Sequence, residues 1–278
     1  MVLFKRNFMS KSVLLIGGSG LLGTALQHYL QEDDSFIVSA PSHDECDLLD
    51  VKHLHGMTYD IIVNLTGQVS SPMSLCRELN TTGIQNVLTA IHNSDTFLVQ
   101  VSTVAVYGTT ENVTESSSVH PETEYAECKA AADRLIQDTI PDDRYLIARL
   151  SNLYGPRQSK GLLWYLLHSI QEGQQISIAD NDGTLCRYFL HVEDAAKIIY
   201  SLIKSNACGV VNIPGPDIYT ISDLISESEK VLGRPIDVSY GTAAPVGNIG
   251  YIDDTVLKSY ILPQYSYSIV GYIEDQLT

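Results

Sequence analysis

The chain has 278 residues, of which 44% are hydrophobic and 18% are charged, as in an ordinary soluble protein that can bury a substantial core. Its formal net charge of −16 argues against binding to nucleic acid, because phosphates require a basic surface. No apolar run approaches the roughly 18 residues that a membrane-spanning helix needs. Neither a nucleic acid nor a membrane is therefore expected as a partner.

The cysteines indicate the redox environment of the protein. The chain has five cysteines, which are widely spread and form no C-x-x-C pair: Cys46, Cys76, Cys128, Cys186 and Cys208. This pattern is typical of reduced thiols in a cytoplasmic protein and provides no disulfide framework. It also lacks the clustered ligands of a zinc site. We therefore expect a cytoplasmic protein without a metal.

A glycine-rich turn follows a short apolar stretch near the N-terminus. Val13–Ile16 predicts a strand buried on both faces, because four consecutive apolar residues leave no polar side. Gly17, Gly20 and Gly23 come next, and a helix is expected over Leu21–Leu30. Such glycines allow a tight turn, admit a pyrophosphate and bring the helix close to the strand, while the helix N-terminus favours the anion. The alternative is an ordinary strand-to-helix turn.

The next elements along the chain alternate between strand and helix. Strands are expected over Phe36–Ala40, Tyr59–Leu65, Phe97–Val101 and Arg144–Leu150, and helices over Arg77–Ser94, Tyr125–Gln137 and Glu193–Lys204. This alternation predicts an α/β fold with a doubly wound parallel sheet, covered by helices on both faces. The polar stretch Thr109–Glu124 is expected to form a loop over a cleft.

Beyond residue 155, glycines and prolines interrupt shorter elements. We therefore expect a dinucleotide-binding Rossmann domain over residues 1–155 and a mainly substrate-binding lobe over residues 156–278. The segment from about 186 to 204 is expected to return to the Rossmann domain. The C-terminal lobe is then smaller than the Rossmann domain and discontinuous.

The end of the second strand sets cofactor preference in a Rossmann domain. Ser39–His43 contains neither the acidic residue that favours NAD nor the arginine that accommodates NADP, so the choice between the two stays open. Asp47 could cap the short helical stretch after it or bond the adenine amino group, and capping is the more frequent role. Thr66 and Gly67 end the third strand with small residues, where backbone could pass under the cofactor.

Tyr125 and Lys129 are four residues apart on an expected helix, so their side chains project from one face. A neighbouring ammonium favours the phenolate of a tyrosine and can make the hydroxyl a usable proton donor or acceptor. Thr103 lies at the end of the fourth strand, where open α/β sheets place their ligands. A surface Tyr–Lys pair and an ordinary strand-end hydroxyl are the alternatives.

Six segments carry one pattern along nearly the whole chain: GGSGLLG (17–23), STVAVYG (102–108), YAECK (125–129), RLSNLYGPRQ (149–158), DGTLCRYFLHVEDAA (182–196) and DTVLKSYILPQYSYSIVGYIEDQL (254–277). In this order they resemble the extended short-chain dehydrogenases/reductases, also called the NAD-dependent epimerase/dehydratase family. The resemblance implies enzymes that act on nucleotide-activated sugars with NAD or NADP.

The resemblance also implies roles for individual residues. Thr103, Tyr125 and Lys129 would form the catalytic triad, while Asn152 and Arg187 would contact the substrate. A forked guanidinium such as that of Arg187 suits a diphosphate. The expected cofactor contacts are Gly17, Gly20, Leu21, Leu22, Gly23, Asp47, Leu48, Leu65, Thr66, Gly67, Asn80, Tyr125 and Lys129. For Asn80 an exposed or capping position is the alternative.

Two departures from the family pattern narrow the expected chemistry. Val104 and Ala105 stand where 4,6-dehydratases of the family usually carry the Asp-Glu pair that supplies the acid and base for elimination, so 4,6-dehydration is not expected. Tyr188 replaces the usual aspartate after Arg187, which could alter substrate contacts.

The missing acidic residue after the second strand and the short substrate lobe favour a 4-keto reductase, in which a hydride goes to C4 of a nucleotide sugar and a tyrosine donates the proton. A C4 epimerase with tightly bound NAD is the first alternative, and a reductase of another carbonyl substrate is the second. From another class, a non-catalytic dinucleotide-binding regulatory subunit would keep the fold without the chemistry. The resemblance suggests a homodimer through helices near 82–94 and 125–138, although their apolar faces could equally be intrachain core.

Overall fold

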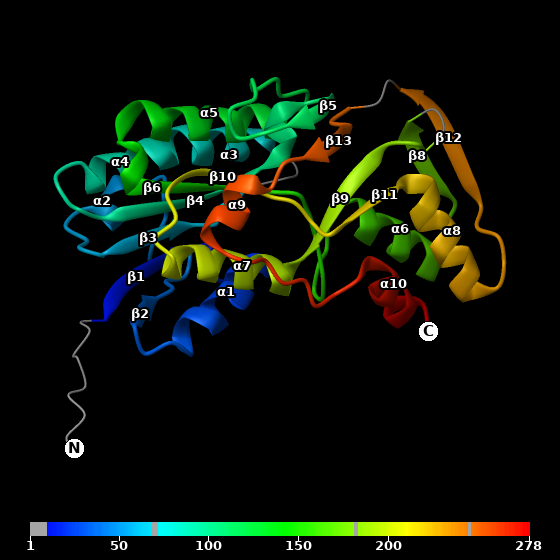
Figure 1. The fold of residues 1–278 in the computed structure, drawn as a ribbon, viewed down its shortest axis with the longest axis horizontal. Coiled ribbons are helices and arrows are strands. Elements are labelled where there is room, and N and C mark those ends of the chain that lie inside the picture. The colour runs from blue at the N-terminus through cyan, green and yellow to red at the C-terminus, as the bar shows by residue number, and fades with distance from the viewer. Residues whose placement is uncertain (1–9, 68–71, 181–182, 244–245) are drawn as a thin grey trace, which may run out of the picture.

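The computed structural model describes residues 10–67, 72–180, 183–243 and 246–278. Six strands form one parallel sheet in the order β10-β6-β4-β3-β1-β2 (Figure 1). Their bounds are β1 Lys11–Ile16, β2 Phe36–Ser39, β3 Ile61–Asn64, β4 Phe97–Thr103, β6 Tyr145–Leu150 and β10 Gly209–Ile213. The sheet confirms the expected doubly wound parallel fold.

Helices cover both faces of this sheet, and α9 lies against its edge strand β10 (Figure 1). One face packs against α1 (Leu21–Gln31) and α7 (Val192–Lys204), the other against α2 (Val51–Leu54), α4 (Ile84–Ile91) and α5 (Glu124–Thr139), and α9 spans Thr255–Tyr260. In β1, Val13 and Leu15 enter one core layer while Leu14 and Ile16 enter the other. Successive strand residues point to opposite faces, so an entirely apolar stretch suits a strand that is covered twice.

The apolar faces of α4 and α5 belong to the core of the chain itself. Ile84, Val87 and Leu88 of α4 are buried together with Ala132 and Ile136 of α5, in the layer that covers β1 and β3. These faces are therefore intrachain core. A homodimer stays a prediction, and it would have to use the outer surfaces of the two helices.

The helix expected over Arg77–Ser94 is interrupted in the structure. It consists of α3 (Met73–Glu78), a π-helical turn, η1 (Leu79–Gly83), and then α4. Within this segment Asn80 Nδ2 donates to the carbonyl of Cys76 at 2.8 Å. A π-helical turn inserts an extra residue into the helix, which a simple 3.6-residue repeat does not predict.

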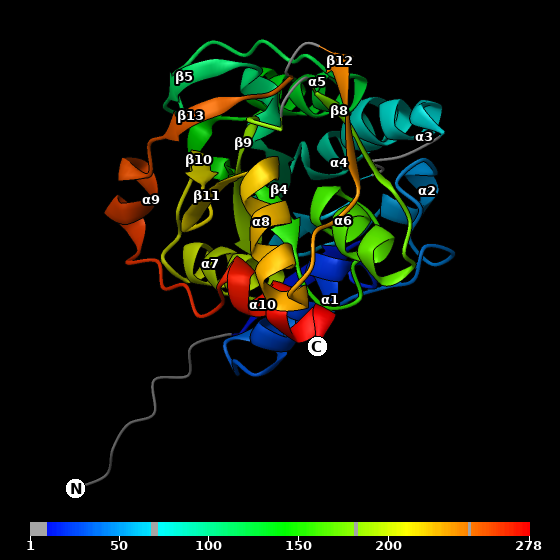
Figure 2. The same ribbon diagram turned by 90° about the vertical axis from the view of Figure 1, so that its right-hand side faces the viewer.

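A second group of elements lies beside the main sheet in Figure 1 and in front of it in Figure 2. One sheet joins β11, β9 and β7, and another joins β12 and β8. The strands are β7 Asn152–Tyr154, β8 Ile176–Asp180, β9 Cys186–His191, β11 Asp217–Thr220 and β12 Val238–Ala243, and the helices are α6 Leu162–Gln171, α8 Ile221–Leu232 and α10 Ile269–Leu277. They share an apolar core of their own. The chain returns to the main sheet through α7 and β10, whereas β9 stays in the small sheet.

The expectation of a loop throughout Thr109–Glu124 is wrong in part. It contains β5 (Thr110–Val113), which pairs in parallel with β13 (Ile249–Ile252). Both strands pack on a short 3₁₀ helix, η2 (Val104–Tyr107), and a second 3₁₀ turn, η3, spans Asp142–Arg144. The partner of β5 comes from a distant part of the chain, so the local polarity of this stretch could not indicate a strand.

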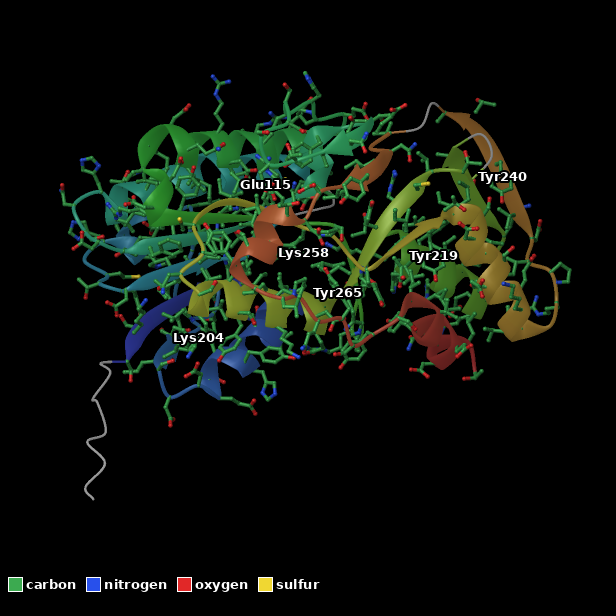
Figure 3. All side chains as sticks on the ribbon, viewed as in Figure 1. Glu115, Lys204, Tyr219, Tyr240, Lys258 and Tyr265 are labelled. Carbon is green, nitrogen blue, oxygen red and sulfur yellow. The ribbon has the colours of Figure 1, made fainter. Side chains whose placement is uncertain are left out.

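The segment between α9 and α10 runs along α7, where Tyr265 is labelled in Figure 3. Tyr265 Oη donates to the carbonyl of Pro214, and the carboxylate of Asp194 in α7 accepts the backbone N–H groups of Ser266 and Tyr267. This segment is thereby held against α7, while α10 packs in the core of the second group. None of the helices that the structure describes has the length and apolar character required to cross a membrane.

Candidate active site

The glycine turn between β1 and α1 has the geometry that a pyrophosphate requires. Gly17 has φ +83°, and its carbonyl accepts the N–H of Gly20 at 3.1 Å. A Cβ on Gly23 would lie 2.3 Å from the carbonyl oxygen of Gly17, so only glycine allows the helix to approach. Gly20 precedes α1 without a side-chain cap, which leaves the N–H groups of the first turn for an anion. These residues fit a dinucleotide.

A cavity of about 580 Å³ extends from this turn to the end of β4. Its volume is within the roughly 300–1,000 Å³ of ligand sites in proteins. Of the residues expected at the cofactor or substrate, it is lined by Gly17, Gly20, Leu21, Leu22, Gly23, Leu65, Gly67, Thr103, Tyr125, Lys129 and Asn152. The structure thus brings most of the expected site residues to one cavity.

Three of these residues come from the elements that meet at the carboxyl edge of the sheet. Thr103 ends β4, and its hydroxyl accepts the N–H of Ala105 at 3.2 Å. Tyr125 lies in the first turn of α5, whose N-cap Thr123 accepts the N–H of Ala126. The helix therefore begins at a position that presents Tyr125 and, one turn later, Lys129 to the same cavity.

Lys129 is buried beside the ends of β3 and β4. Its Nζ donates to the carbonyl of Thr66 at 2.9 Å and to that of Val101 at 3.1 Å. Burial lowers the pKa of Lys129 to about 8, against the opposing charge of Asp133. An ammonium has three N–H donors, so the two carbonyls leave one donor for a ligand in the cavity.

The pKa of Tyr125 shifts in the direction opposite to the one expected from the sequence. Burial raises it, and the negative charge of Asp133 adds to the effect. The helical spacing predicts that Lys129 lowers it, but the lysine is engaged by two carbonyls and itself suffers the cost of burial. At neutral pH the phenol of Tyr125 is therefore protonated, which is the form of a proton donor.

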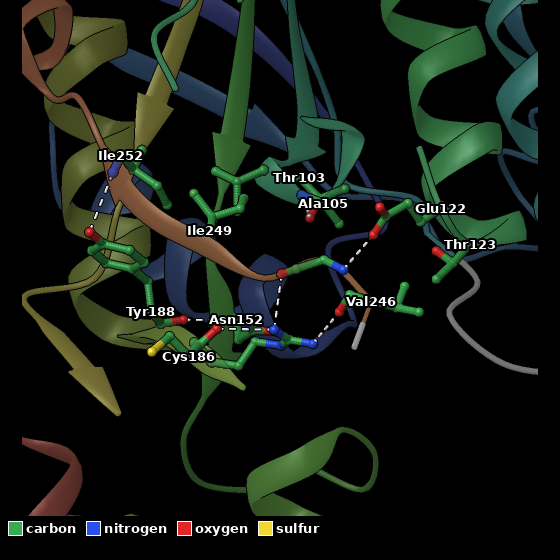
Figure 4. A pocket seen from close by; sticks show the side chains of 13 residues that line it. Thr103, Ala105, Glu122, Thr123, Asn152, Cys186, Tyr188, Val246, Ile249 and Ile252 are labelled. Atoms are coloured by element: carbon green, nitrogen blue, oxygen red, sulfur yellow. Dashed lines mark hydrogen bonds between the residues drawn. The ribbon is translucent and has the colours of Figure 1, made fainter. Parts of the chain in front are cut away.

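A smaller cavity of about 190 Å³, shown in Figure 4, adjoins the first. Thr103 and Asn152 line both cavities. Arg187 lines the smaller one, where its guanidinium donates to the carbonyls of Val246 at 2.6 Å and Gly247 at 2.9 Å. Asn152 Nδ2 donates to the carbonyl of Tyr188 at 3.0 Å. The two expected substrate residues thus lie next to the threonine at the end of β4.

The positions that depart from the family pattern also border the smaller cavity. Val104 and Ala105 line it and bring no carboxylate. Tyr188 Oη donates to the carbonyl of Gly250 and accepts the N–H of Ile252. Tyr188 therefore holds β13 in place.

Four residues expected at the cofactor are not among the described residues that line either cavity. They are Asp47, Leu48, Thr66 and Asn80. Leu48 and Asn80 are buried, so the exposed alternative for Asn80 is wrong. Thr66 contributes its carbonyl to Lys129. Their contact with a cofactor stays a prediction.

The capping role considered for Asp47 is wrong. The cap of α2 is Asp50, whose carboxylate accepts the N–H of Lys52 at 3.0 Å. Asp47 instead accepts the N–H of Leu49, and its own N–H donates to His53 Nδ1. The aspartate nearer to the first helical residue satisfies the free N–H group, as capping geometry requires.

Sequence reasoning missed several residues that line the cavities. Arg157, Gln158, Ser159, Lys160, Gly161, Leu162 and Leu163 line the larger cavity, and Glu122 and Thr123 line the smaller one. Glu122 accepts the N–H of Gly247 at 2.7 Å, which holds its pKa below the ordinary value. The RLSNLYGPRQ segment contained part of this set, but the pairing of β5 with β13, which lies beside the smaller cavity, depends on tertiary contacts.

The comparison with known sequences decides the family of the chain. Residues 13–215 match the sequence model of the NAD dependent epimerase/dehydratase family. The chain belongs to this family. Membership confirms the resemblance and the class of NAD-dependent enzyme expected from the sequence.

Relatives of this family differ in the reaction that they catalyse. The chain is 27% identical over 284 residues to an N-acetyl-alpha-D-glucosaminyl-diphospho-ditrans,octacis-undecaprenol 4-epimerase of Escherichia coli O157:H7, with 94% of this chain and 84% of that protein covered. It is 20% identical to UDP-glucuronic acid 4-epimerase of Bacillus cereus in complex with NAD, with a TM-score of 0.82 and coverage of 96% and 98%. It is also 20% identical to RMD of Pseudomonas aeruginosa in complex with NADPH, with a TM-score of 0.78 and coverage of 96% of this chain and 98% of that chain. At these identities the two structures show the shared fold alone.

Proposed function

We propose that this family member transfers a hydride between NAD(P) and C4 of a nucleotide-activated sugar, and that it works as a 4-keto reductase. One observation carries the proposal. Thr103 lies at the junction of a cavity that begins at the glycine turn and a smaller cavity that contains Arg187. A cofactor in the first and a sugar in the second would meet beside Tyr125.

In the proposed mechanism, the turn at Gly17 and the N-terminus of α1 hold the pyrophosphate of the cofactor. When bound, the reduced nicotinamide supplies the hydride. The Thr103 hydroxyl bonds the C4 oxygen, and Tyr125 donates its phenolic proton to that oxygen as the carbonyl is reduced. The third N–H of Lys129 would bond the nicotinamide ribose and so hold the cofactor beside Tyr125.

The neutral phenol of Tyr125 is the form that a proton donor to the C4 oxygen requires. A phenol with its ordinary pKa of about 10 is also protonated at neutral pH, so this state fits the donor role in a reductase and in an epimerase. Val104 and Ala105 bring no carboxylate to the smaller cavity, and the Glu122 carboxylate there is engaged by the N–H of Gly247, which argues against elimination of water.

Similarity over nearly the whole chain to a curated 4-epimerase favours a second candidate, a C4 epimerase with tightly bound NAD. The two reactions share the hydride transfer at C4 and differ in the fate of the cofactor and the keto sugar. In the reductase the cofactor leaves oxidised. In the epimerase the keto sugar rotates and takes the hydride back on its other face.

One experiment distinguishes these functions. Purified protein is incubated with NADPH or NADH and a panel of nucleotide 4-keto sugars and nucleotide hexoses, while nicotinamide absorbance is followed. Net oxidation with a keto sugar supports the reductase, and an epimeric product without net oxidation supports the epimerase. Cofactor binding without turnover of any panel member would contradict both and favour the non-catalytic regulatory subunit.

A further inference from the structure

A buried carboxylate lies one helical turn beyond Lys129. Asp133 Oδ2 accepts from Ser102 Oγ at 3.0 Å and from Arg149 Nε at 3.0 Å, and its side chain is only 2% exposed. Its other oxygen, Oδ1, is buried and has no hydrogen-bond partner among the residues that the structure describes. An unsatisfied carboxylate oxygen is costly in a protein interior, so this site calls for an explanation.

The carboxylate joins the two elements that carry the proposed catalytic groups. Ser102 immediately precedes Thr103 in β4, and Asp133 lies beyond Tyr125 and Lys129 in α5. The Ser102–Asp133 hydrogen bond therefore connects the strand of the threonine to the helix of the tyrosine and lysine. Lys129 makes a second connection through the carbonyl of Val101 in the same strand.

Arg149 makes a further hydrogen bond on the side away from Asp133. Its Nη1 donates to Tyr107 Oη at 2.8 Å, and that hydroxyl donates to Asn212 Oδ1 at 2.8 Å. The chain of contacts thus runs from α5 through β6 and η2 to β10. A buried ion pair is often no more stabilising than apolar residues of similar size, so stability alone gives little reason for this arrangement.

Within the part of the chain that the structure describes, few charged or titratable groups act on Lys129. Those that act on it are Asp133 and Cys128 from its own helix and Cys76 from α3. Burial raises the pKa of Cys76 to about 11, so this thiol is uncharged at neutral pH. Tyr125 on the same helix is a neutral phenol under these conditions. Among the described residues, Asp133 is the carboxylate that acts on Lys129; burial raises the pKa of Asp133 itself, while the neighbouring Arg149 guanidinium favours its charged form.

We propose that Asp133 is a positioning residue, which fixes Thr103 against α5 and keeps Lys129 in the ammonium form that holds the cofactor. The inference rests on the proposed function, because Lys129 is taken as a cofactor contact. Asp133 acts through Ser102 and Lys129 and touches neither cofactor nor substrate.

The test is the pH dependence of NADPH or NADH binding by the full-length chain, followed by nicotinamide fluorescence, together with the pH profile of turnover. Affinity should fall as the pH rises through the pKa of Lys129, about 8. In Asp133→Asn the negative charge is lost, so this fall should move to lower pH by about one unit. Asp133→Glu restores the charge and should bring the fall back toward that of the unmodified chain.

Ser102→Ala is the matched control, since it removes a hydrogen bond to the same carboxylate but keeps the charge. It should leave unchanged the pH at which cofactor affinity falls, while it lowers turnover. If Asp133→Asn leaves Arg149 unpaired and fails to fold, the double variant Asp133→Asn/Arg149→Met removes both charges and should show a smaller shift in the same direction, because the lost cation had opposed the charge of Lys129. An unchanged pH dependence in a folded variant overturns the proposal, whereas absence of cofactor binding in the unmodified chain overturns the proposed function.

Discussion

At the scale of single residues, the site depends on how burial and hydrogen bonding set protonation states. Tyr125 and Lys129 lie one helical turn apart, yet burial acts on them in opposite directions. It raises the pKa of the phenol and lowers that of the ammonium to about 8. Both groups therefore keep their protons at neutral pH, and the phenol has a proton to donate when a carbonyl is reduced.

Tyr125→Phe tests the proton donor directly. Removal of the hydroxyl should abolish turnover, because no other group is assigned to protonate the C4 oxygen, and it should spare cofactor binding. Turnover and nicotinamide fluorescence measure the two effects. Tyr251→Phe is the control, since Tyr251 is 50% exposed and lines neither cavity. Activity of Tyr125→Phe near that of the control would remove Tyr125 from the mechanism.

Arg187→Ala tests the diphosphate contact. Loss of a charge-assisted contact should weaken binding of a nucleoside diphosphate or nucleotide sugar by ~1.5–3 kcal/mol, which is roughly a 10- to 150-fold rise in Kd. Calorimetry with the substrate found in the panel measures it. Arg134→Ala removes an exposed arginine of α5 that pairs with Asp138 and should leave Kd unchanged. Equal affinity of both variants would favour a carbonyl substrate without a diphosphate.

At the scale of elements, the sequence predicts what depends on local pattern and fails where partners are distant. The strand at Val13–Ile16 and the helix after it can be inferred from burial pattern and glycine spacing. The pairing of β5 with β13 cannot, because Thr110–Val113 is polar and finds its partner only in the folded chain. The π-helical turn at Leu79–Gly83 likewise departs from the 3.6-residue repeat.

The residues of the candidate site also differ in whether the sequence alone indicates them. Motifs with fixed spacing, such as Tyr125 and Lys129, could be found from the sequence. Glu122 and the backbone of Val246 and Gly247 could not, because they border the smaller cavity only once β5 and β13 have paired. The links from Ser102 to Asp133 also require the packing of α5 on β4.

Gly23→Ala tests the approach of α1 to the glycine turn. The new Cβ would lie 2.3 Å from the carbonyl oxygen of Gly17, which forces helix and turn apart and should lower cofactor affinity by at least tenfold. Nicotinamide fluorescence measures the affinity, and circular dichroism checks the fold. Gly271→Ala in α10 meets only the Ser268 hydroxyl at 3.1 Å and should bind normally. Unchanged affinity in Gly23→Ala would place the pyrophosphate elsewhere.

At the scale of the whole molecule, a buried histidine helps to join the two groups of elements. His191 ends β9 and caps α7, where its Nδ1 accepts the N–H of Glu193. Its ring stacks on Tyr267 of the C-terminal segment at 3.8 Å between centroids and meets Tyr154 edge to face. Burial lowers the pKa of His191 to about 4, so the ring is neutral in the folded chain.

This burial predicts sensitivity to acid. Between about pH 6.5, where an exposed histidine titrates, and about pH 4, the unfolded chain binds a proton that the folded chain does not. The neutral His191 therefore contributes fully to the free energy of unfolding above that range. This contribution is lost as the pH falls, and the free energy of unfolding should decrease by about 2 kcal/mol between about pH 7 and pH 5. Urea unfolding at the two pH values should show a smaller difference for His191→Gln than for the exposed control His43→Gln. Equal differences would exclude His191 as the cause.

The fate of a labelled hydride tests the central claim most directly. NADPH or NADH carrying deuterium at the transferable C4 position is incubated with the protein and a nucleotide 4-keto sugar, and the product is analysed by NMR. We predict deuterium at C4 of the sugar, in an amount equal to the cofactor oxidised. Oxidised cofactor with no deuterium at sugar C4 would contradict the account.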